Sequence, residues 1–551
     1  MIRIQSNNTC HHRLYFVVSL IFLLFFLFHN GLYLYLDNTG MATGDASRHL
    51  IHLHDTWQRI SSGRGLSLIG DPVTYNYPPL VYLATCPMIA VGGMNLITVM
   101  AGQWLFWVVL AVSVYLLTGR VSGGMGGFIG LMLVMGSPYL SKVGRDYALD
   151  MPVTALTALA LLMLAKSDNF NRRGYSYGFF IICAMAVLAK PMAVLYLSGP
   201  FLWVAYMALF PRKKACKNPG AKAVLVKGLL LAGVLLWPFY GLHFSQVLHH
   251  GRLLLQVALE RPVDGFFDTL WFISTTAWGV LIFVATGFGL LMISYRLIRK
   301  TPLPRDLGMI SLGLLWGLLV MGLLPFRDYR YYLPFIPMAA VVASAGINAI
   351  KHRPLKLLIT GIILYGTLSS FTWWIAPDLG FYRPFRAGVE LLSHRPHSMA
   401  WSPPDPHRLI PREMEDIYDI MAPDRNALIV VSAPGKLNAI GTFNLVRGWR
   451  ILEGGCPLIH TGPPGNPPPG KAENKFLDLY MKPADLPGQG ENLVIIRLTR
   501  EDDYDMLPPG VREDLINAGF SHRPDMMLNR GLVRGIDGSL LTMRVLRIPI
   551  R

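Results

Sequence analysis

Long apolar runs separated by short polar segments fill the first two thirds of the chain. A helix needs about 20 apolar residues to cross the hydrocarbon core of a membrane, and eleven runs approach or exceed that length. A further run, Pro79–Val91, is too short to span and is predicted to lie in the membrane interface. The pattern predicts a polytopic α-helical membrane protein with about eleven spans, at residues 14–36, 96–118, 123–141, 151–166, 175–189, 192–210, 228–244, 271–295, 307–325, 331–350 and 355–375.

The first run predicts how the chain enters the membrane. Arg3 and Arg13 precede it, and it is too long for a signal-peptide core and lacks a small-residue cleavage site. We therefore expect an uncleaved signal anchor with a cytoplasmic N-terminus. A long first outer loop, residues 37–95, follows, and its pattern predicts a helix at Ala46–Ile60.

After Trp374 the sequence becomes rich in proline and in balanced charge. Its apolar pattern predicts a small soluble α/β domain at 376–551, on the outer side of a membrane domain at 1–375. The predicted elements are strands at 427–432, 493–498 and 541–548, helices at 412–421 and 511–518, and a Pro/Gly loop at 462–470.

Composition supports the membrane class. Of 551 residues, 52% are hydrophobic and only 15% are charged, whereas soluble proteins carry about 25% charged residues. This balance excludes a disordered chain or a small disulfide scaffold. The five cysteines are scattered without a CxxC pair, which excludes a zinc ribbon or a redox motif.

The net charge of +17 is confined to the apolar part. Residues 1–375 hold 29 Lys and Arg but only 12 Asp and Glu, whereas residues 376–551 hold 21 of each. A basic excess between apolar spans is what the positive-inside rule produces, so nucleic acid is not an expected partner.

The positions of the cations predict the topology. With Pro79–Val91 left in the interface, the predicted cytoplasmic segments hold 19 Lys and Arg, and the longer opposite loops hold 10. We therefore expect an integral protein of the cell (inner or plasma) membrane, with its N-terminus in the cytoplasm and its C-terminal domain outside. Ten of the 12 acidic residues before 376 then face outward, which places the candidate chemistry on the outer face.

Five motifs lie in order on that predicted face: GDASR at 44–48, YNYPPL at 75–80, GRDYALDMP at 144–152, LAKP at 188–191 and RYYLPFIP at 330–337. Over residues 14–350 this arrangement resembles the integral-membrane glycosyltransferases of the C-type (GT-C) fold, namely the protein O-mannosyltransferases and the lipid A aminoarabinose transferases. Two features depart from that family. Ala46 stands where many members have a second carboxylate, and Tyr77 and Pro78 replace an acidic residue and a lysine of the aminoarabinose transferases.

The resemblance implies a polyprenyl-phosphate-linked sugar as donor and a hydroxyl group of a lipid, glycan or protein as acceptor. An inverting single displacement needs a carboxylate base, for which Asp45 is the candidate, with Asp150 orienting the acceptor or a helix. The leaving phosphate needs cations rather than a general acid. Candidate phosphate ligands are Arg145, Lys190, Arg327 and Arg330, and candidate substrate-binding residues are Arg48, Tyr75, Tyr77, Tyr331 and Tyr332.

Each assignment has a structural alternative. Asp45 and Asp150 could cap the helices that follow them, the cations could snorkel at the interface, and the tyrosines could belong to an aromatic belt. A divalent metal is a candidate cofactor, because Asp45, His49 and His52 would share one helix face. The glycines at 123–127 are interpreted as close helix packing rather than a phosphate loop.

Two other functions remain as alternatives to a membrane glycosyltransferase. A transporter or flippase would carry charged residues in mid-span, and the span centres here are almost uncharged. A polysaccharide polymerase or ligase of envelope glycans would have its large outer loop in the middle of the chain, whereas here that loop comes first.

Overall fold

The computed structural model describes the helical part of the chain almost completely and five strands near its C-terminal end. The described residues are 9–37, 44–70, 77–210, 219–259, 269–270, 273–323, 329–372, 428–432, 459–461, 492–499, 527–534 and 540–549. The chain divides into two units, residues 1–33, 55–91 and 99–403 in the first and residues 34–54, 92–98 and 404–551 in the second. The predicted boundary at 375/376 lies outside the described residues and stays a prediction.

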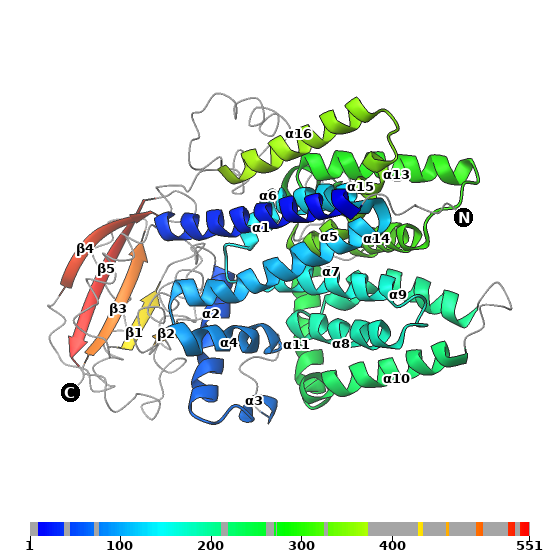
Figure 1. The fold of residues 1–551 in the computed structure, drawn as a ribbon. Coiled ribbons are helices and arrows are strands. Elements are labelled where there is room, and N and C mark those ends of the chain that lie inside the picture. Colours follow the sequence, from blue (N-terminus) through cyan, green and yellow to red (C-terminus); the bar gives the residue numbers. More distant parts are fainter. Residues whose placement is uncertain are drawn as a thin grey trace. The chain divides into compact units, whose positions relative to one another are not determined.

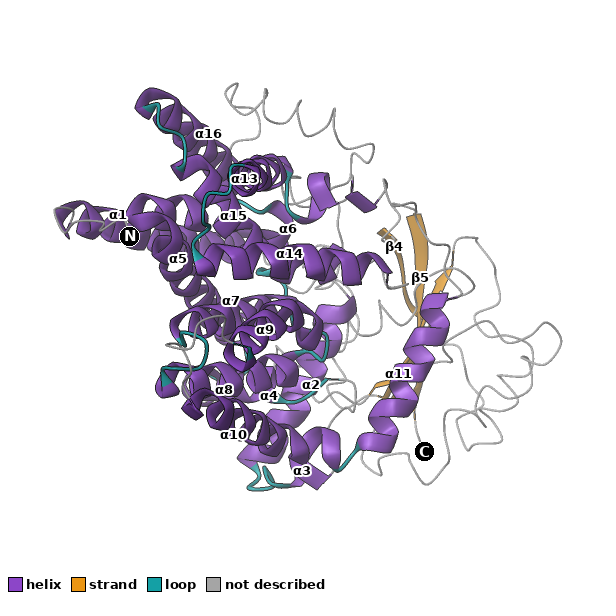
Figure 2. Ribbon diagram, turned by 90° about the vertical axis from the view of Figure 1, so that its right-hand side faces the viewer, coloured by secondary structure: helices purple, strands orange, loops and turns teal. Residues whose placement is uncertain are grey.

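Each predicted span overlaps at least one helix of the structure, and helices make up most of the described residues (Figure 2). Six helices are long and apolar enough to cross a membrane by length and composition, as far as the described residues go; the count of eleven spans stays a prediction. The helices are α1 (Thr9–Asp37), α2 (Gly44–Ser61), α3 (Ser67–Gly70), α4 (Leu80–Gly92), α5 (Leu96–Met135), α6 (Pro138–Val143), α7 (Asp150–Lys166), α8 (Arg173–Ala189), α9 (Ala193–Leu209), α10 (Pro219–Leu236), η2 (Trp237–Gly241), α11 (Phe244–Leu259), η3 (Ile273–Ala277), α13 (Val280–Ile298), α14 (Arg305–Leu323), η4 (Tyr329–Phe335), α15 (Ile336–Asn348) and α16 (Arg353–Thr372).

The predicted span at 96–118 and most of the one at 123–141 lie within α5, which reverses direction at Gly123; the end of the second span falls in α6. This glycine has φ 77° and ψ −178°, a conformation that residues with a Cβ rarely adopt. A Cβ added at Gly130 would lie 2.4 Å from Cγ2 of Thr118, although twelve residues of straight helix would separate the two by about 18 Å. The two halves of α5 therefore pack against each other as a hairpin, as the close-packing interpretation of the glycines predicts.

Two short elements of the first outer loop are helices, and the interfacial position of Pro79–Val91 stays a prediction. The run Pro79–Val91 is the 13-residue helix α4, and the predicted helix at Ala46–Ile60 is α2. Beyond these, α8 packs against both α7 and α10 (Figure 1).

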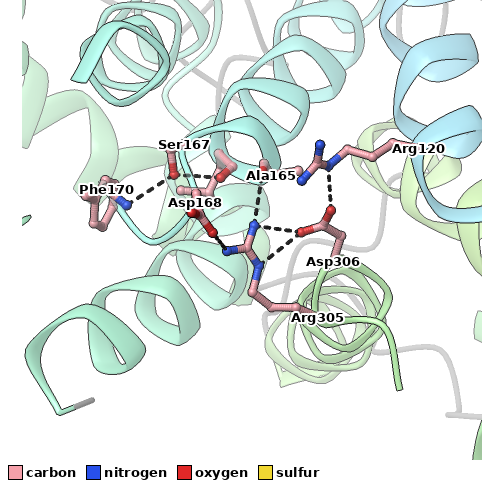
Figure 3. A network of polar contacts seen from close by, with 8 residues as sticks. Arg120, Ala165, Ser167, Asp168, Phe170, Arg305 and Asp306 are labelled. Carbon is pink, nitrogen blue, oxygen red and sulfur yellow. Dashed lines mark hydrogen bonds and ion pairs between the residues drawn. The ribbon is translucent and has the colours of Figure 1, made fainter. Parts of the chain in front are cut away.

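One network of ion pairs joins three predicted cytoplasmic segments (Figure 3). The guanidinium of Arg305 binds the carboxylates of Asp168 and Asp306 and donates to the carbonyl of Ala165 at 3.0 Å. Nε of Arg120, in the α5 hairpin turn, lies 2.5 Å from Oδ2 of Asp306. The turns after α7, before α14 and within α5 therefore lie at one end of the helical unit, here called the Asp306 end.

The opposite end of the unit is here called the Asp150 end, and two contacts join residues in the first outer loop or near the predicted outer ends of spans. His243 contacts the carbonyl of Ile69 at 2.7 Å, and Ser137 donates to the carbonyl of Ala277 at 3.1 Å. Because α7 begins at Asp150 and ends at Lys166, its 17 residues separate the two ends by about 25 Å. The topology predicted from the charge pattern stays a prediction.

We expect Arg305→Ala to destabilise the helical unit, because Asp168, Asp306 and the Ala165 carbonyl lose their shared partner. Networked, partly buried ion pairs of this kind contribute about 1–2 kcal/mol. Thermal unfolding in detergent measures the effect, with the exposed Arg299→Ala as control. Equal melting temperatures for the two variants would show that the network adds no stability.

The second unit contains a five-stranded sheet in the order β2-β1-β3-β5-β4 (Figure 1). Strands β1 and β2 and strands β1 and β3 pair in parallel, and β5 pairs antiparallel with both β3 and β4. The three strands predicted from sequence are all present, as β1, β3 and β5, whereas the helices predicted at 412–421 and 511–518 lie outside the described residues. The bounds are β1 Leu428–Ser432, β2 Ile459–Thr461, β3 Asn492–Thr499, β4 Met527–Arg534 and β5 Leu540–Pro549.

Candidate functional site

Three candidate residues from different elements meet at the Asp150 end. Nζ of Lys190 lies 2.5 Å from Oδ1 of Asp150 and 4.7 Å from the ring centroid of Tyr331. The side chains of Asp150 and Lys190 are only 5% and 12% exposed. A carboxylate, an ammonium group and an aromatic face thus form one largely buried cluster.

Helix geometry explains why the pair forms there. Asp150 is the first residue of α7, and Lys190 directly follows the last residue of α8. The start of a helix is the positive end of its dipole and favours a carboxylate, whereas the end of a helix favours a cation. Each charge therefore lies where its own helix stabilises it, and the pair joins two neighbouring helices.

The structure decides between two interpretations of these residues. The N-cap position of α7 is Leu149, which makes no side-chain capping bond, so Asp150 does not cap this helix; its carboxylate binds Lys190. Lys190 does not extend freely toward water, because its ammonium group is paired and mostly buried. The snorkelling alternative is therefore wrong for Lys190.

Arg145 is held by a residue that the sequence reasoning missed. Its Nε donates to Oδ1 of Asn30 at 2.8 Å, and the amide of Asn30 donates to the carbonyl of Phe26 at 2.9 Å. Asn30 is 1% exposed on α1. The only signal for it in the sequence is a polar residue inside the first apolar run.

The residues after Arg145 are packed into the protein. Tyr147 is 1% exposed, and its hydroxyl lies 2.9 Å from that of Thr85 on α4. Burial raises the pKa of the Tyr147 hydroxyl above its usual range, so this group keeps its proton. Asp146 is 9% exposed, which adds a second buried carboxylate to this part of the chain.

The two candidate tyrosines of η4, Tyr331 and Tyr332, have different surroundings. The Tyr331 ring faces the ammonium group of Lys190. A residue of an aromatic belt does not need such a specific contact. Tyr332 is 2% exposed, and its carbonyl accepts a hydrogen bond from the Trp278 indole at 3.0 Å. Its place in the core does not favour direct contact with substrate. Arg330, on the same element, and Tyr77, before α4, are both half-buried.

The remaining candidates cannot be placed in this cluster. Tyr75 and Arg327 lie outside the described residues, and Asp45 and Arg48 belong to α2 by their backbone while their side chains lie outside the described part. The roles of these four residues stay predictions.

The described side chains give no support to the hypothesis of a bound divalent metal. Among them, no group of three or more His, Cys, Asp and Glu residues is arranged to hold an ion. His49 is 5% exposed and His52 is half-buried on α2. A site that also used Asp45 stays untested, since that side chain is not described.

Comparison with known proteins identifies related folds. Residues 76–237 match the family model described as dolichyl-phosphate-mannose-protein mannosyltransferase. Two crystal structures of ArnT from Cupriavidus metallidurans are similar over 98% of this chain and 98% of theirs. One is bound to undecaprenyl phosphate, with 12% identity and a TM-score of 0.58, and the other is in the apo state, with 13% identity and a TM-score of 0.58. A comparison with curated protein sequences gives no match.

These matches confirm the resemblance predicted from the five motifs. The chain resembles the membrane glycosyltransferases of the GT-C fold and, with six long apolar helices among its described residues, is an integral membrane protein. The segment that matches the family model runs from Asn76 to Trp237. It therefore contains Arg145, Asp150 and Lys190.

Proposed function

We propose that this protein is a membrane glycosyltransferase that moves a sugar from a polyprenyl-phosphate-linked donor to a hydroxyl group of a lipid, glycan or protein at the outer face of the cell membrane. The observation that carries the proposal is the buried Asp150–Lys190–Tyr331 cluster at the Asp150 end. Asp150 and Lys190 lie inside the segment that matches the mannosyltransferase family model. The shared fold with ArnT supports the same class of reaction.

A lipid-linked phosphate is the donor chemistry that the comparisons favour. The matching family is described by a dolichyl-phosphate-linked mannose, and the similar ArnT structure holds undecaprenyl phosphate. Both are polyprenyl phosphates. A donor of this kind keeps its polyprenyl chain in the membrane and presents its phosphate at the interface. The candidate phosphate-binding cations of this protein are expected at the same depth.

Lys190 is the proposed centre of the phosphate site. An ammonium group has three N–H donors. One N–H of Lys190 points to Asp150, and the Tyr331 ring covers a second. The third is left for a phosphate oxygen, and Arg145, Arg327 and Arg330 would complete the site. Asp150 is a positioning residue in this scheme, because its carboxylate fixes the ammonium group rather than the substrate.

Asp45 is the proposed general base. The acceptor oxygen attacks the anomeric carbon, its proton passes to the Asp45 carboxylate, and the bond between that carbon and the phosphate oxygen breaks. The electron pair leaves with the polyprenyl phosphate, whose charge the cations stabilise. A single displacement of this kind inverts the configuration at the anomeric carbon.

Transfer from defined donors tests the function. The purified protein is incubated with polyprenyl phosphates that carry different sugars and with cell-envelope lipids, glycans and proteins as acceptors. We expect release of free polyprenyl phosphate in amounts equal to the sugar transferred, as measured by mass spectrometry. Consumption of nucleotide sugars alone, with every lipid-linked donor intact, would contradict the proposal.

The proposed topology has a separate test. A reporter enzyme that is active only outside the cytoplasm should be active when fused after Trp374 and silent when fused after Lys214. The expectation follows from the basic segments that gather at the Asp306 end. The reverse pattern would mean that the orientation in the membrane is inverted, with the Asp150 end in the cytoplasm.

A further inference from the structure

The segment Gly144–Leu149, between α6 and α7, contains Arg145 and directly precedes Asp150, the first residue of α7. It is a series of turns rather than a helix or strand. Tyr147 and Leu149 in it are each 1% exposed. A buried segment without regular structure depends on side chains from elsewhere to fix its backbone.

Gln103, in the first half of α5, supplies one such contact. It is fully buried, and its Nε2 donates to the carbonyl of Ala148 at 2.8 Å. The two residues are 45 positions apart in the chain. Gln103 thus holds the segment at Ala148, two residues before Asp150. Its contact is with the backbone of the segment and not with the side chain of Asp150 or Arg145.

Thr85, on α4, supplies the second contact. Its hydroxyl donates to the carbonyl of Val81 at 3.0 Å, and a hydroxyl has only one proton to donate. Tyr147 must therefore donate to Thr85 Oγ1 across their 2.9 Å contact. This bond joins the segment to the helix that follows the YPPL motif.

Side chains pack closely against two glycine backbones at the same place. A Cβ added at Gly102 would lie 2.5 Å from Oγ1 of Thr85, and one added at Gly144 would lie 2.3 Å from Nε1 of Trp107. Since Gly102 and Trp107 flank Gln103 on α5, one stretch of α5 packs against both α4 and the segment. The segment has little room to move relative to α4.

We propose that Gln103, Thr85 and Tyr147 are positioning residues for sugar transfer, which set the depth at which Arg145 meets the donor phosphate. The inference rests on the proposed function. Tyr147 belongs to the GRDYALDMP motif, whereas Gln103 and Thr85 lie outside the five motifs that carry the family resemblance. They act through the backbone of 144–149, so their loss shifts the phosphate site without removing any of its charges.

The expected kinetic effect follows from this indirect role. A displacement of about 1 Å in a catalytic site can cost about 100-fold in rate. We therefore expect Gln103→Met, which keeps length but loses the amide, and Tyr147→Phe, which keeps the ring, to lower kcat by about 10- to 100-fold. KM for the acceptor should change little.

Thr157→Val is the matched control. Thr157 lies on α7, is fully buried, and its hydroxyl has no hydrogen-bond partner among the described residues. Removing that hydroxyl loses no bond, so kcat should stay within about twofold of the wild type. A melting temperature is measured for each variant to separate positioning from loss of fold.

Two measurements decide the inference. Amide hydrogen exchange of the purified protein should become faster within 144–149 in Gln103→Met and Tyr147→Phe and stay unchanged in Thr157→Val. In an Arg145→Gln background, Gln103→Met should cost little further rate, because both act through Arg145.

Unchanged exchange at 144–149, or an equal rate loss in the two backgrounds, would overturn the inference. A wild-type protein that transfers no sugar from any polyprenyl phosphate would instead count against the proposed function. In that case the exchange measurement still decides whether Gln103 and Tyr147 hold the segment.

Discussion

Replacing Asp45 by Asn should lower the rate of sugar transfer at least about 100-fold, because a general base contributes about 10²–10⁴-fold to the rate. Asn keeps the shape and hydrogen bonding of Asp and caps helices about equally well. Asp45 lies in the first turn of α2, so expression and melting temperature should stay nearly unchanged. Initial rates of polyprenyl phosphate release from purified protein give the comparison.

Asp45→Ala separates the two roles of this position. It removes the base together with a carboxylate in the first turn of α2, so it should match Asp45→Asn in rate but melt at a lower temperature. Activity of Asp45→Asn within a few-fold of the wild type would mean that Asp45 only stabilises the first turn of α2. The base would then be sought at Asp146, which is 9% exposed, since the carboxylate of Asp150 is already bound to Lys190.

Lys190→Met should cost both activity and stability. Loss of a cation that faces the leaving phosphate is worth about 10²–10³-fold in rate. Removing one partner of a buried ion pair leaves the other charge uncompensated, at a cost of about 3 kcal/mol. A simple snorkelling lysine would be lost at little cost. Turnover at saturating donor and thermal unfolding in detergent measure the two effects.

A double variant separates the two effects. In Asp150→Asn/Lys190→Met no charge is left unpaired, so the melting temperature should recover while turnover stays low. Lys166→Met is the matched control, because Lys166 also faces a tyrosine ring, 5.4 Å from the centroid of Tyr175, at the other end of α7. Recovery of turnover together with stability would reduce Lys190 to a structural role.

The apolar pattern predicted most of the membrane part because helix length and hydropathy are local properties. The short run at Pro79–Val91 became α4, and the change of side between successive spans placed Asp150 and Lys190 at the same end. That alternation narrows the partners of a charge to one end of the unit. It cannot choose among them, since pairing depends on which helices are neighbours.

The supporting contacts could not be predicted in this way. Asn30 and Gln103 are single polar residues within apolar runs, and their use depends on what packs against them. Asn30 binds Arg145, 115 residues away, and Gln103 binds the carbonyl of Ala148. Contacts over such sequence distances leave no local pattern. Tyr332 shows the same limit, because its neighbour Tyr331 faces Lys190 while Tyr332 itself is buried.

The Asp150–Lys190 pair also bears on how the chain enters the membrane. In the proposed topology both residues must cross the hydrocarbon core during synthesis, where a single charge is costly. They stand at the far ends of two neighbouring helices joined by the short turn at 167–172. If α7 and α8 insert together as a hairpin, the two charges cross as a neutral pair. Biogenesis would then favour the same contact that the reaction uses.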